Sequence, residues 1–169
     1  MTLDDVVNYF PNAKFIILYR KSLLEQFVSL KIAEKTDRWE WTRDFVLPES
    51  LRVDVGEFME FCRRTKEFYE KVARAPWIRN CSLVLEYEEL ISDPQKIFDS
   101  KIFPFLGLPS HPVSTSMVKQ NTKSMETIVE NFEEVRPWIT EFRFSLFLPE
   151  SSREMCGTRP IHTFQDGLF

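Results

Sequence analysis

The stretch KFIILYRKSLLEQFVS, residues 14–29, decides the fold. Residues 14–20 form a continuous apolar run between Lys14 and Arg20, which predicts a strand buried on both faces of a parallel sheet. Ser22 and Glu25 then match the capping box, in which each side chain binds an otherwise unpaired backbone N–H of the first helical turn. The stretch therefore predicts a strand followed almost at once by a helix over residues 22–36.

The same alternation of strand and helix continues along the chain. Apolar side chains recur at helical spacing between residues 58 and 72, and Pro76 ends the helix that they predict. Residues 82–87 predict a second buried strand, which delivers a polar cluster at its C-terminal end. A strand, a crossover helix and a second strand favour an α/β fold with a parallel sheet.

Three further elements are expected beyond the second strand. Residues 93–94, an Asp-Pro pair, predict the start of a helix, and Gly107 predicts its end, with a kink at Pro104. Apolar spacing predicts another helix over residues 124–136. Alternation of apolar and polar residues over 142–148 predicts an edge strand.

Length and composition favour one ordinary domain. The 169 residues are 43% hydrophobic, so we expect a single domain over residues 1–169, with an irregular tail over 145–169. The net charge of −4 argues against a surface built for nucleic acid. No apolar run approaches the roughly 18 residues of a membrane span, and the N-terminus shows no secretory signal, so we expect a cytoplasmic protein.

Several kinds of site are disfavoured by what the sequence lacks. The four glycines lie too far apart for a phosphate-binding loop of the GxGxxG or GxxxxGK[ST] type. Cys62, Cys81 and Cys156 are widely separated and have no histidine nearby, so we expect no disulfide and no metal site. His111 and His162 have no identifiable partner, and the sequence names no catalytic residue.

The candidate binding residues lie where the first strand ends. Arg20 and Lys21 follow the strand directly, and Ser29 lies on the next helix. Ligands of open α/β sheets bind beyond the C-terminal ends of the strands, where two cations beside a helix N-terminus favour a phosphate. A plainer interpretation fits these residues equally well, because Arg20 and Lys21 can simply solvate a strand end and Ser29 can be a surface hydroxyl.

The same stretch resembles the second nucleotide-binding segment of sulfotransferases. The similar sequences are FPNAKFIILYR, residues 10–20, and QFVSLKIAEKTDRW, residues 26–39, and they are closest to the bacterial carbohydrate branch typified by trehalose sulfotransferases. Later segments follow in the family's order, namely LEYEEL (85–90), FLGLP (105–109), KQNTKS (119–124) and IVENF (128–132). The resemblance covers residues 10–135, the central and C-terminal part of such an enzyme.

This resemblance implies a three-layer, P-loop-like α/β fold that binds 3′-phosphoadenosine 5′-phosphosulfate (PAPS) or adenosine 3′,5′-bisphosphate. On that mapping Arg20 and Ser29 hold the 3′-phosphate, and Tyr87 lies near the adenine. The spacing from Arg20 to Ser29 is one residue longer than is usual in the family, so Lys21 is a further candidate for the phosphate contact. The complete family transfers a sulfuryl group from PAPS to a hydroxyl, here plausibly of a carbohydrate or other small molecule.

One part of the family's pattern has no counterpart in the sequence. The N-terminal strand, the Gly/Ser/Thr-rich loop and the helix that bind the 5′-phosphosulfate are not found, and neither is a catalytic base. We therefore expect either a truncated reading frame or a relative that has lost catalysis. The sequence leaves open whether this chain is an enzyme.

Two alternatives to a sulfotransferase remain at this point. A non-catalytic interaction module, or a dimeric structural relative of the fold, would use exposed aromatic side chains to contact a protein partner. The candidate aromatics for such an interface are Trp39, Trp41, Phe45, Trp77 and Trp138. A remnant of a P-loop nucleotide kinase is disfavoured, because no lysine lies in a Gly-rich loop.

Overall fold

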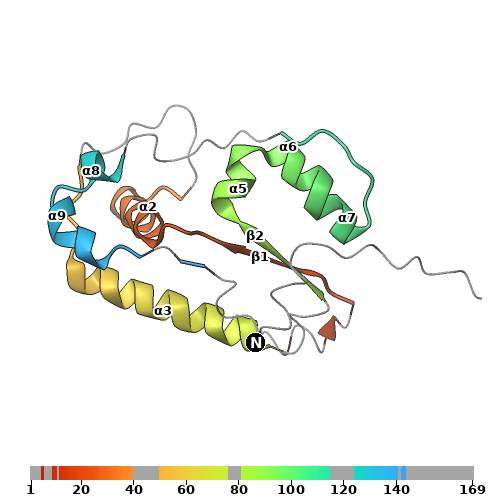
Figure 1. Ribbon diagram of the computed structural model, residues 1–169, viewed down its shortest axis with the longest axis horizontal. Coiled ribbons are helices and arrows are strands. Elements are labelled where there is room, and N and C mark those ends of the chain that lie inside the picture. Colours follow the sequence, from red (N-terminus) through yellow and green to blue (C-terminus); the bar gives the residue numbers. More distant parts are fainter. Residues whose placement is uncertain are drawn as a thin grey trace, which may run out of the picture.

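A small parallel sheet lies at the centre of the molecule (Figure 1). The computed structural model describes residues 5, 9, 10, 12–39, 50–75, 81–114, 124–140, 142 and 143. Strand β1 (Phe15–Tyr19) pairs in parallel with β2 (Ser82–Glu86), from Phe15 opposite Ser82 to Tyr19 opposite Glu86. Between them the chain forms helices α2 (Leu23–Thr36) and α3 (Val55–Arg74). The predicted α/β fold with a parallel sheet is confirmed.

Short helical segments follow β2 along the chain. They are α5 (Tyr87–Ser92), α6 (Pro94–Ile97), the π-helical η1 (Phe98–Ile102), α7 (Phe103–Leu106), α8 (Met125–Ile128), α9 (Phe132–Val135) and the 3₁₀ turn η2 (Arg136–Trp138). None of the helices in the described ranges is long and apolar enough to cross a bilayer.

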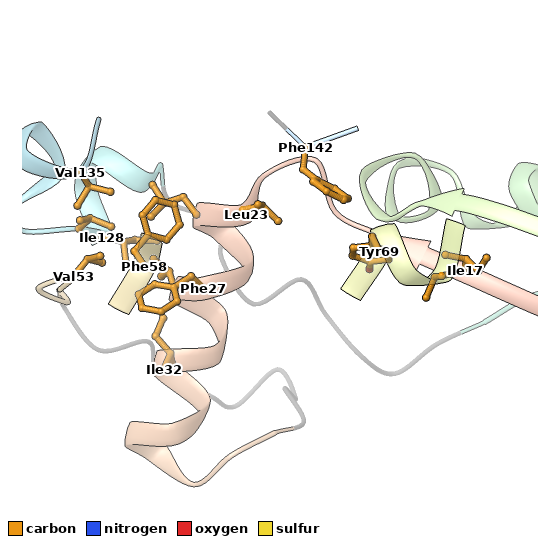
Figure 2. Packing of buried hydrophobic residues seen from close by; sticks show 14 of the residues in the cluster. Ile17, Leu23, Phe27, Ile32, Val53, Phe58, Tyr69, Ile128, Val135 and Phe142 are labelled. Carbon is orange, nitrogen blue, oxygen red and sulfur yellow. The ribbon is translucent and has the colours of Figure 1, made fainter. Parts of the chain in front are cut away.

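Helices pack against both faces of the sheet, which gives three layers. On one face Ile17 of β1 belongs to the main core with apolar residues of α2 and α3, including Leu23, Phe27 and Tyr69 (Figure 2). On the other face Leu85 of β2 packs against Ile97 and Ile102 of the segment α6–η1. Alternate residues of a strand point to opposite faces, so adjacent positions of β2 serve different cores.

Strand β1 differs from the prediction of a strand buried on both faces. Ile17 is buried, but Ile16 and Leu18 are 44% and 43% exposed. The segment α6–η1 packs against Leu83 and Leu85 of β2, and in the described part of the chain no helix covers the neighbouring positions of β1 in the same way. The prediction was wrong for this face because a continuous apolar run does not reveal how far the covering layer extends.

The predicted helix over residues 124–136 is broken in the middle. Helix α8 ends at Ile128 because the next residue, Val129, forms a parallel β-bridge with Leu51. Asn131 then turns its side chain to the backbone of Val53, and α9 begins one residue later. The helical spacing of the apolar residues correctly predicted a helix in each half of this range, but it wrongly predicted one continuous helix.

Other predicted boundaries are partly confirmed. Ser22 Oγ accepts the N–H of Glu25, as the capping prediction required, and Gly107 ends α7 with a φ of 75°. The irregularity expected at Pro104 lies before the proline, as the π-helical segment η1. Of the predicted edge strand 142–148, residues 144–148 lie outside the described residues, as does the tail.

Candidate functional site

Arg20 and Tyr87 meet at the C-terminal edge of the sheet. Each residue directly follows the last residue of its strand, and those last residues, Tyr19 and Glu86, are paired in the parallel register. The guanidinium carbon of Arg20 lies 3.9 Å from the centre of the Tyr87 ring. This is a cation–π stack, which holds the planar guanidinium in one orientation.

One face of α2 forms a pocket with Arg20. Gln26, Ser29, Leu30 and Ala33 recur at the helical spacing that places side chains on one face. Together with Arg20, Trp39 and Phe61 they line an open pocket of about 280 Å³. The structure thus places Arg20, which follows β1, and Ser29 of α2 in the wall of the same pocket.

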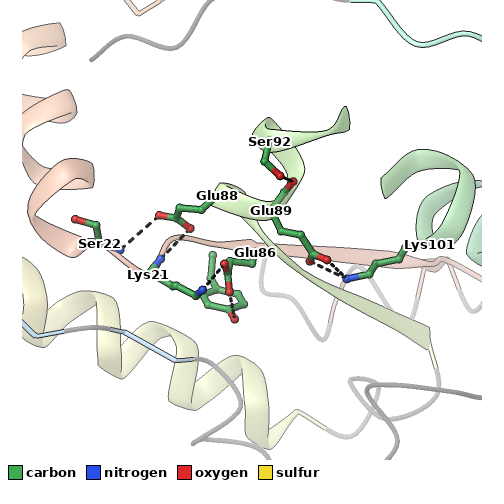
Figure 3. A network of polar contacts seen from close by, with 8 residues as sticks. Lys21, Ser22, Glu86, Glu88, Glu89, Ser92 and Lys101 are labelled. Carbon is green, nitrogen blue, oxygen red and sulfur yellow. Dashed lines mark hydrogen bonds and ion pairs between the residues drawn. The ribbon is translucent and has the colours of Figure 1, made fainter. Parts of the chain in front are cut away.

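Lys21 points to a different partner. Its ammonium forms an ion pair with Glu86 at 2.7 Å, and the Tyr19 hydroxyl donates to the other carboxylate oxygen of Glu86 at 3.3 Å (Figure 3). Lys21 is not among the residues that line the pocket. Arg20 therefore supplies the positive charge of the pocket wall.

Glu88 takes the position that an anion would occupy at the start of α2. Its carboxylate accepts the backbone N–H of Lys21 at 3.2 Å and that of Ser22 at 3.5 Å (Figure 3). Free N–H groups at a helix N-terminus attract anions, and here the protein's own carboxylate already binds the N–H of the N-cap residue and that of the residue before it. The pocket that contains Arg20 and Ser29 lies along the side of the helix, away from these two N–H groups.

Gln26, Trp39 and Phe61 were not among the predicted binding residues. The three-residue spacing of Gln26 from Ser29 on the predicted helix was the available signal. Trp39 is a candidate interface aromatic and Phe61 lies in the helix predicted from residues 58–72, and no pattern in the sequence shows that they share a pocket. Trp39 is 65% exposed, and Trp138 is 48% exposed. Trp41, Phe45 and Trp77 lie outside the described residues.

Two partly buried ionisable groups of α3 stay protonated at neutral pH. Burial raises the pKa of the Cys62 thiol, which neighbours Phe61 on α3. Burial also raises the pKa of the Tyr69 phenol, whose hydroxyl donates to the backbone oxygen of Leu18 at 2.8 Å. Neither group is therefore poised to act as an anionic nucleophile.

The lining of the pocket suits binding more than proton transfer. Its polar side chains are a guanidinium, a hydroxyl and an amide, and the other walls are aromatic or aliphatic. Arginine and a hydroxyl are suited to phosphate, while aromatic walls suit a ring attached to it. Within the described residues, no group of three or more His, Cys, Asp and Glu side chains could hold a metal ion.

A comparison with protein families agrees with this geometry. A family model described as the sulfotransferase family matches residues 1–112. The matched range contains Arg20, Ser29 and Tyr87, and it supports a P-loop-like version of the α/β fold. No curated protein and no solved structure matched the chain.

Proposed function

Because this chain belongs to the sulfotransferase family, we propose that it binds the nucleotide PAPS, or its product adenosine 3′,5′-bisphosphate, by the 3′-phosphate. The family points to sulfuryl transfer with a sulfate-donor nucleotide in general. The observation that carries the finer proposal is that Arg20 and Ser29, which come from different elements, line one pocket. The acceptor would be a hydroxyl of a carbohydrate or another small molecule.

The charge state of Arg20 supports a bound anion. Among the described residues no carboxylate pairs with the half-buried guanidinium, which stacks on the Tyr87 ring. A cation that is partly removed from water without a counter-charge is costly, and an anionic ligand relieves that cost. A phosphate also offers two oxygens to the guanidinium at once, which matches its planar fork of donors.

Each predicted residue has a role in this proposal. Arg20 and Ser29 contact the phosphate. The Tyr87 ring orients Arg20 by stacking on its guanidinium, and it is also the candidate neighbour of the adenine. Lys21 takes a secondary part, because its ammonium must leave Glu86 before it can reach a phosphate. The family match covers a range of residues, and these proposed roles are specific to single side chains within it.

The size of the pocket limits what it can hold. Sites for drug-sized ligands usually measure about 300–1,000 Å³, whereas this pocket measures about 280 Å³. It suits a phosphate with the attached sugar better than a whole dinucleotide-like cofactor. When bound, PAPS supplies the sulfuryl group; this chain's pocket residues would fix the far end of the nucleotide, and they include no base for the acceptor hydroxyl.

Free thiols are consistent with the proposed location. Cys62 and Cys81 are not in disulfides, as is usual for proteins in the reducing cytoplasm. A cytoplasmic location is therefore part of the proposal.

Calorimetric titration with adenosine 3′,5′-bisphosphate tests the proposal. Because hydrogen bonds to charged groups are worth about 1.5–3 kcal/mol, Arg20→Ala should weaken binding by about 10- to 100-fold. The matched control is Arg64→Ala, which removes an exposed arginine of α3 that pairs with Glu60 outside the pocket. Adenosine 5′-monophosphate, which lacks the 3′-phosphate, should bind far more weakly than the bisphosphate. Equal affinity of the two nucleotides, or binding unaffected by Arg20→Ala, would refute the proposal.

One observation favours the alternative of a self-associating relative. Ile16 and Leu18 present apolar surface on one face of β1, which is unusual for a parallel sheet. A second copy of the chain could cover this face. Light scattering distinguishes the alternatives, because a dimer that forms without nucleotide and is abolished by Leu18→Lys favours self-association, and a strict monomer removes its support.

A further inference from the structure

One polar atom of the pocket has no hydrogen-bond partner in the described part of the chain. It is the side-chain oxygen of Gln26, Oε1, which is buried. Gln26 lines the same pocket as Arg20 and Ser29. Buried polar atoms of native proteins are nearly always hydrogen-bonded, because an unmet acceptor keeps its desolvation cost. Gln26 therefore carries an unmet acceptor on a side chain that lines the pocket, and we ask which ligand group the amide could bind.

Building on the proposed function, we propose that Gln26 determines specificity by accepting a hydrogen bond from the ribose 2′-hydroxyl of the bound nucleotide. Gln26 and Ser29 lie three residues apart on α2, so their Cβ atoms are about 5–6 Å apart on one face of the helix. The 2′-hydroxyl is attached to the carbon next to the one that carries the 3′-phosphate. A phosphate held by Arg20 and Ser29 brings that hydroxyl within reach of the Gln26 amide.

Rotation of the amide connects the free and bound states. Oε1 is sealed from solvent in the structure, so a half-turn of the amide about its Cγ–Cδ bond has to exchange Oε1 with the NH2 group before the oxygen can meet the hydroxyl. This torsion is broad and roughly two-fold in glutamine, so both orientations are accessible. In the turned orientation the oxygen accepts the 2′-hydroxyl of a ribonucleotide, whereas a 2′-deoxyribonucleotide brings no donor to it. The pocket then prefers ribonucleotides to 2′-deoxyribonucleotides.

The test compares adenosine 3′,5′-bisphosphate with its 2′-deoxy analogue by calorimetry. Unmodified protein should bind the deoxy analogue about fivefold more weakly, the effect of one neutral hydrogen bond. Gln26→Met, which keeps the length of the side chain but has no amide, should bind both nucleotides equally, with the affinity of the unmodified protein for the deoxy analogue. A second measurement, urea unfolding without ligand, should show Gln26→Met to be as stable as the unmodified protein or more stable, because the unmet oxygen is gone.

The matched control is Gln95→Met on α6. The Gln95 amide is satisfied, since it accepts the N–H of Val113 at 2.8 Å and donates to Asp99 at 3.0 Å. This variant should lose stability and keep the preference for the ribonucleotide.

Different failures point to different errors. Equal binding of the two nucleotides by unmodified protein, in an Arg20-dependent manner, overturns the role of Gln26 alone. The role of Gln26 is also overturned if Gln26→Met keeps the fivefold difference between the two nucleotides, whether or not it binds both of them more weakly. No binding of adenosine 3′,5′-bisphosphate at all overturns the proposed function, and this inference with it.

Discussion

The stack between Arg20 and Tyr87 makes a quantitative prediction about nucleotide affinity. Tyr87→Leu removes the aromatic ring that lies 3.9 Å from the guanidinium, whereas Tyr87→Phe keeps the ring and removes the hydroxyl. A cation–π contact is worth about 0.5–1 kcal/mol at exposed sites and about 2 kcal/mol when desolvated. Both residues are half-buried, so a value near 1 kcal/mol applies, equivalent to about a fivefold change in Kd.

The expected result is that Tyr87→Leu weakens binding of adenosine 3′,5′-bisphosphate about fivefold, because Arg20 is no longer held in one orientation. Tyr87→Phe should bind as the unmodified protein does. Calorimetric titration measures both variants, and thermal unfolding without ligand checks that each is folded.

A double variant identifies the route of the effect. If Tyr87 acts through Arg20, then Tyr87→Leu should add little to Arg20→Ala, because the ring has no guanidinium left to orient. Fully additive losses would show that the ring contacts the nucleotide independently of Arg20. Unchanged affinity of Tyr87→Leu alone would refute the reasoning from the stack.

Two further predictions concern stability. Asn131 is buried and pairs with both the N–H and the carbonyl oxygen of Val53, at 2.9 and 2.8 Å, so Asn131→Leu should lower the free energy of unfolding in urea by about 2–4 kcal/mol. Ser50→Ala, which breaks an exposed bond between the same two segments, should cost under about 0.5 kcal/mol, and equal losses would contradict the role of burial. Hydrogen bonds from two arginines of α3 lower the pKa of Glu60 from its ordinary 4.5 to about 2, so Glu60 stabilises the fold above the ordinary value and this contribution is lost as pH falls through about 2. The stability difference between the unmodified protein and Glu60→Gln should therefore shrink between about pH 5 and pH 2, and a constant difference would contradict the assignment.

Local sequence patterns predicted the elements that carry their own signals. The apolar run of β1, the cap at Ser22 and the left-handed Gly107 each depend on a few adjacent residues, and each is found in the structure. The break between α8 and α9 could not be predicted in this way. It depends on Leu51 and Val53, about eighty residues earlier in the chain, and helical spacing contains no information about such partners.

The candidate site also contains residues that the sequence could predict and contacts that it could not. Arg20 and Ser29 could be named because the end of a strand and one face of the following helix meet at one edge of a sheet, whereas Tyr87 was named from the resemblance to sulfotransferases. The contacts made by the residues around them could not be predicted. Sequence alone did not show that Glu86 would bind Lys21, nor that Trp39 would line the pocket.

Two glutamates at and just after the end of β2 bind the other positive groups at this edge of the sheet and leave the guanidinium of Arg20 without a carboxylate partner among the described residues. Four groups at this edge could attract an anion: the guanidinium of Arg20, the ammonium of Lys21, and the backbone N–H groups of Lys21 and Ser22. Glu86 binds the ammonium, and Glu88 binds the two N–H groups. Since those carboxylates also repel anions, they favour Arg20, Ser29 and the side of α2 over the helix start for the phosphate of the proposed complex. On that proposal the two carboxylates determine where the phosphate binds, and the position of the phosphate in turn sets the sugar against Gln26.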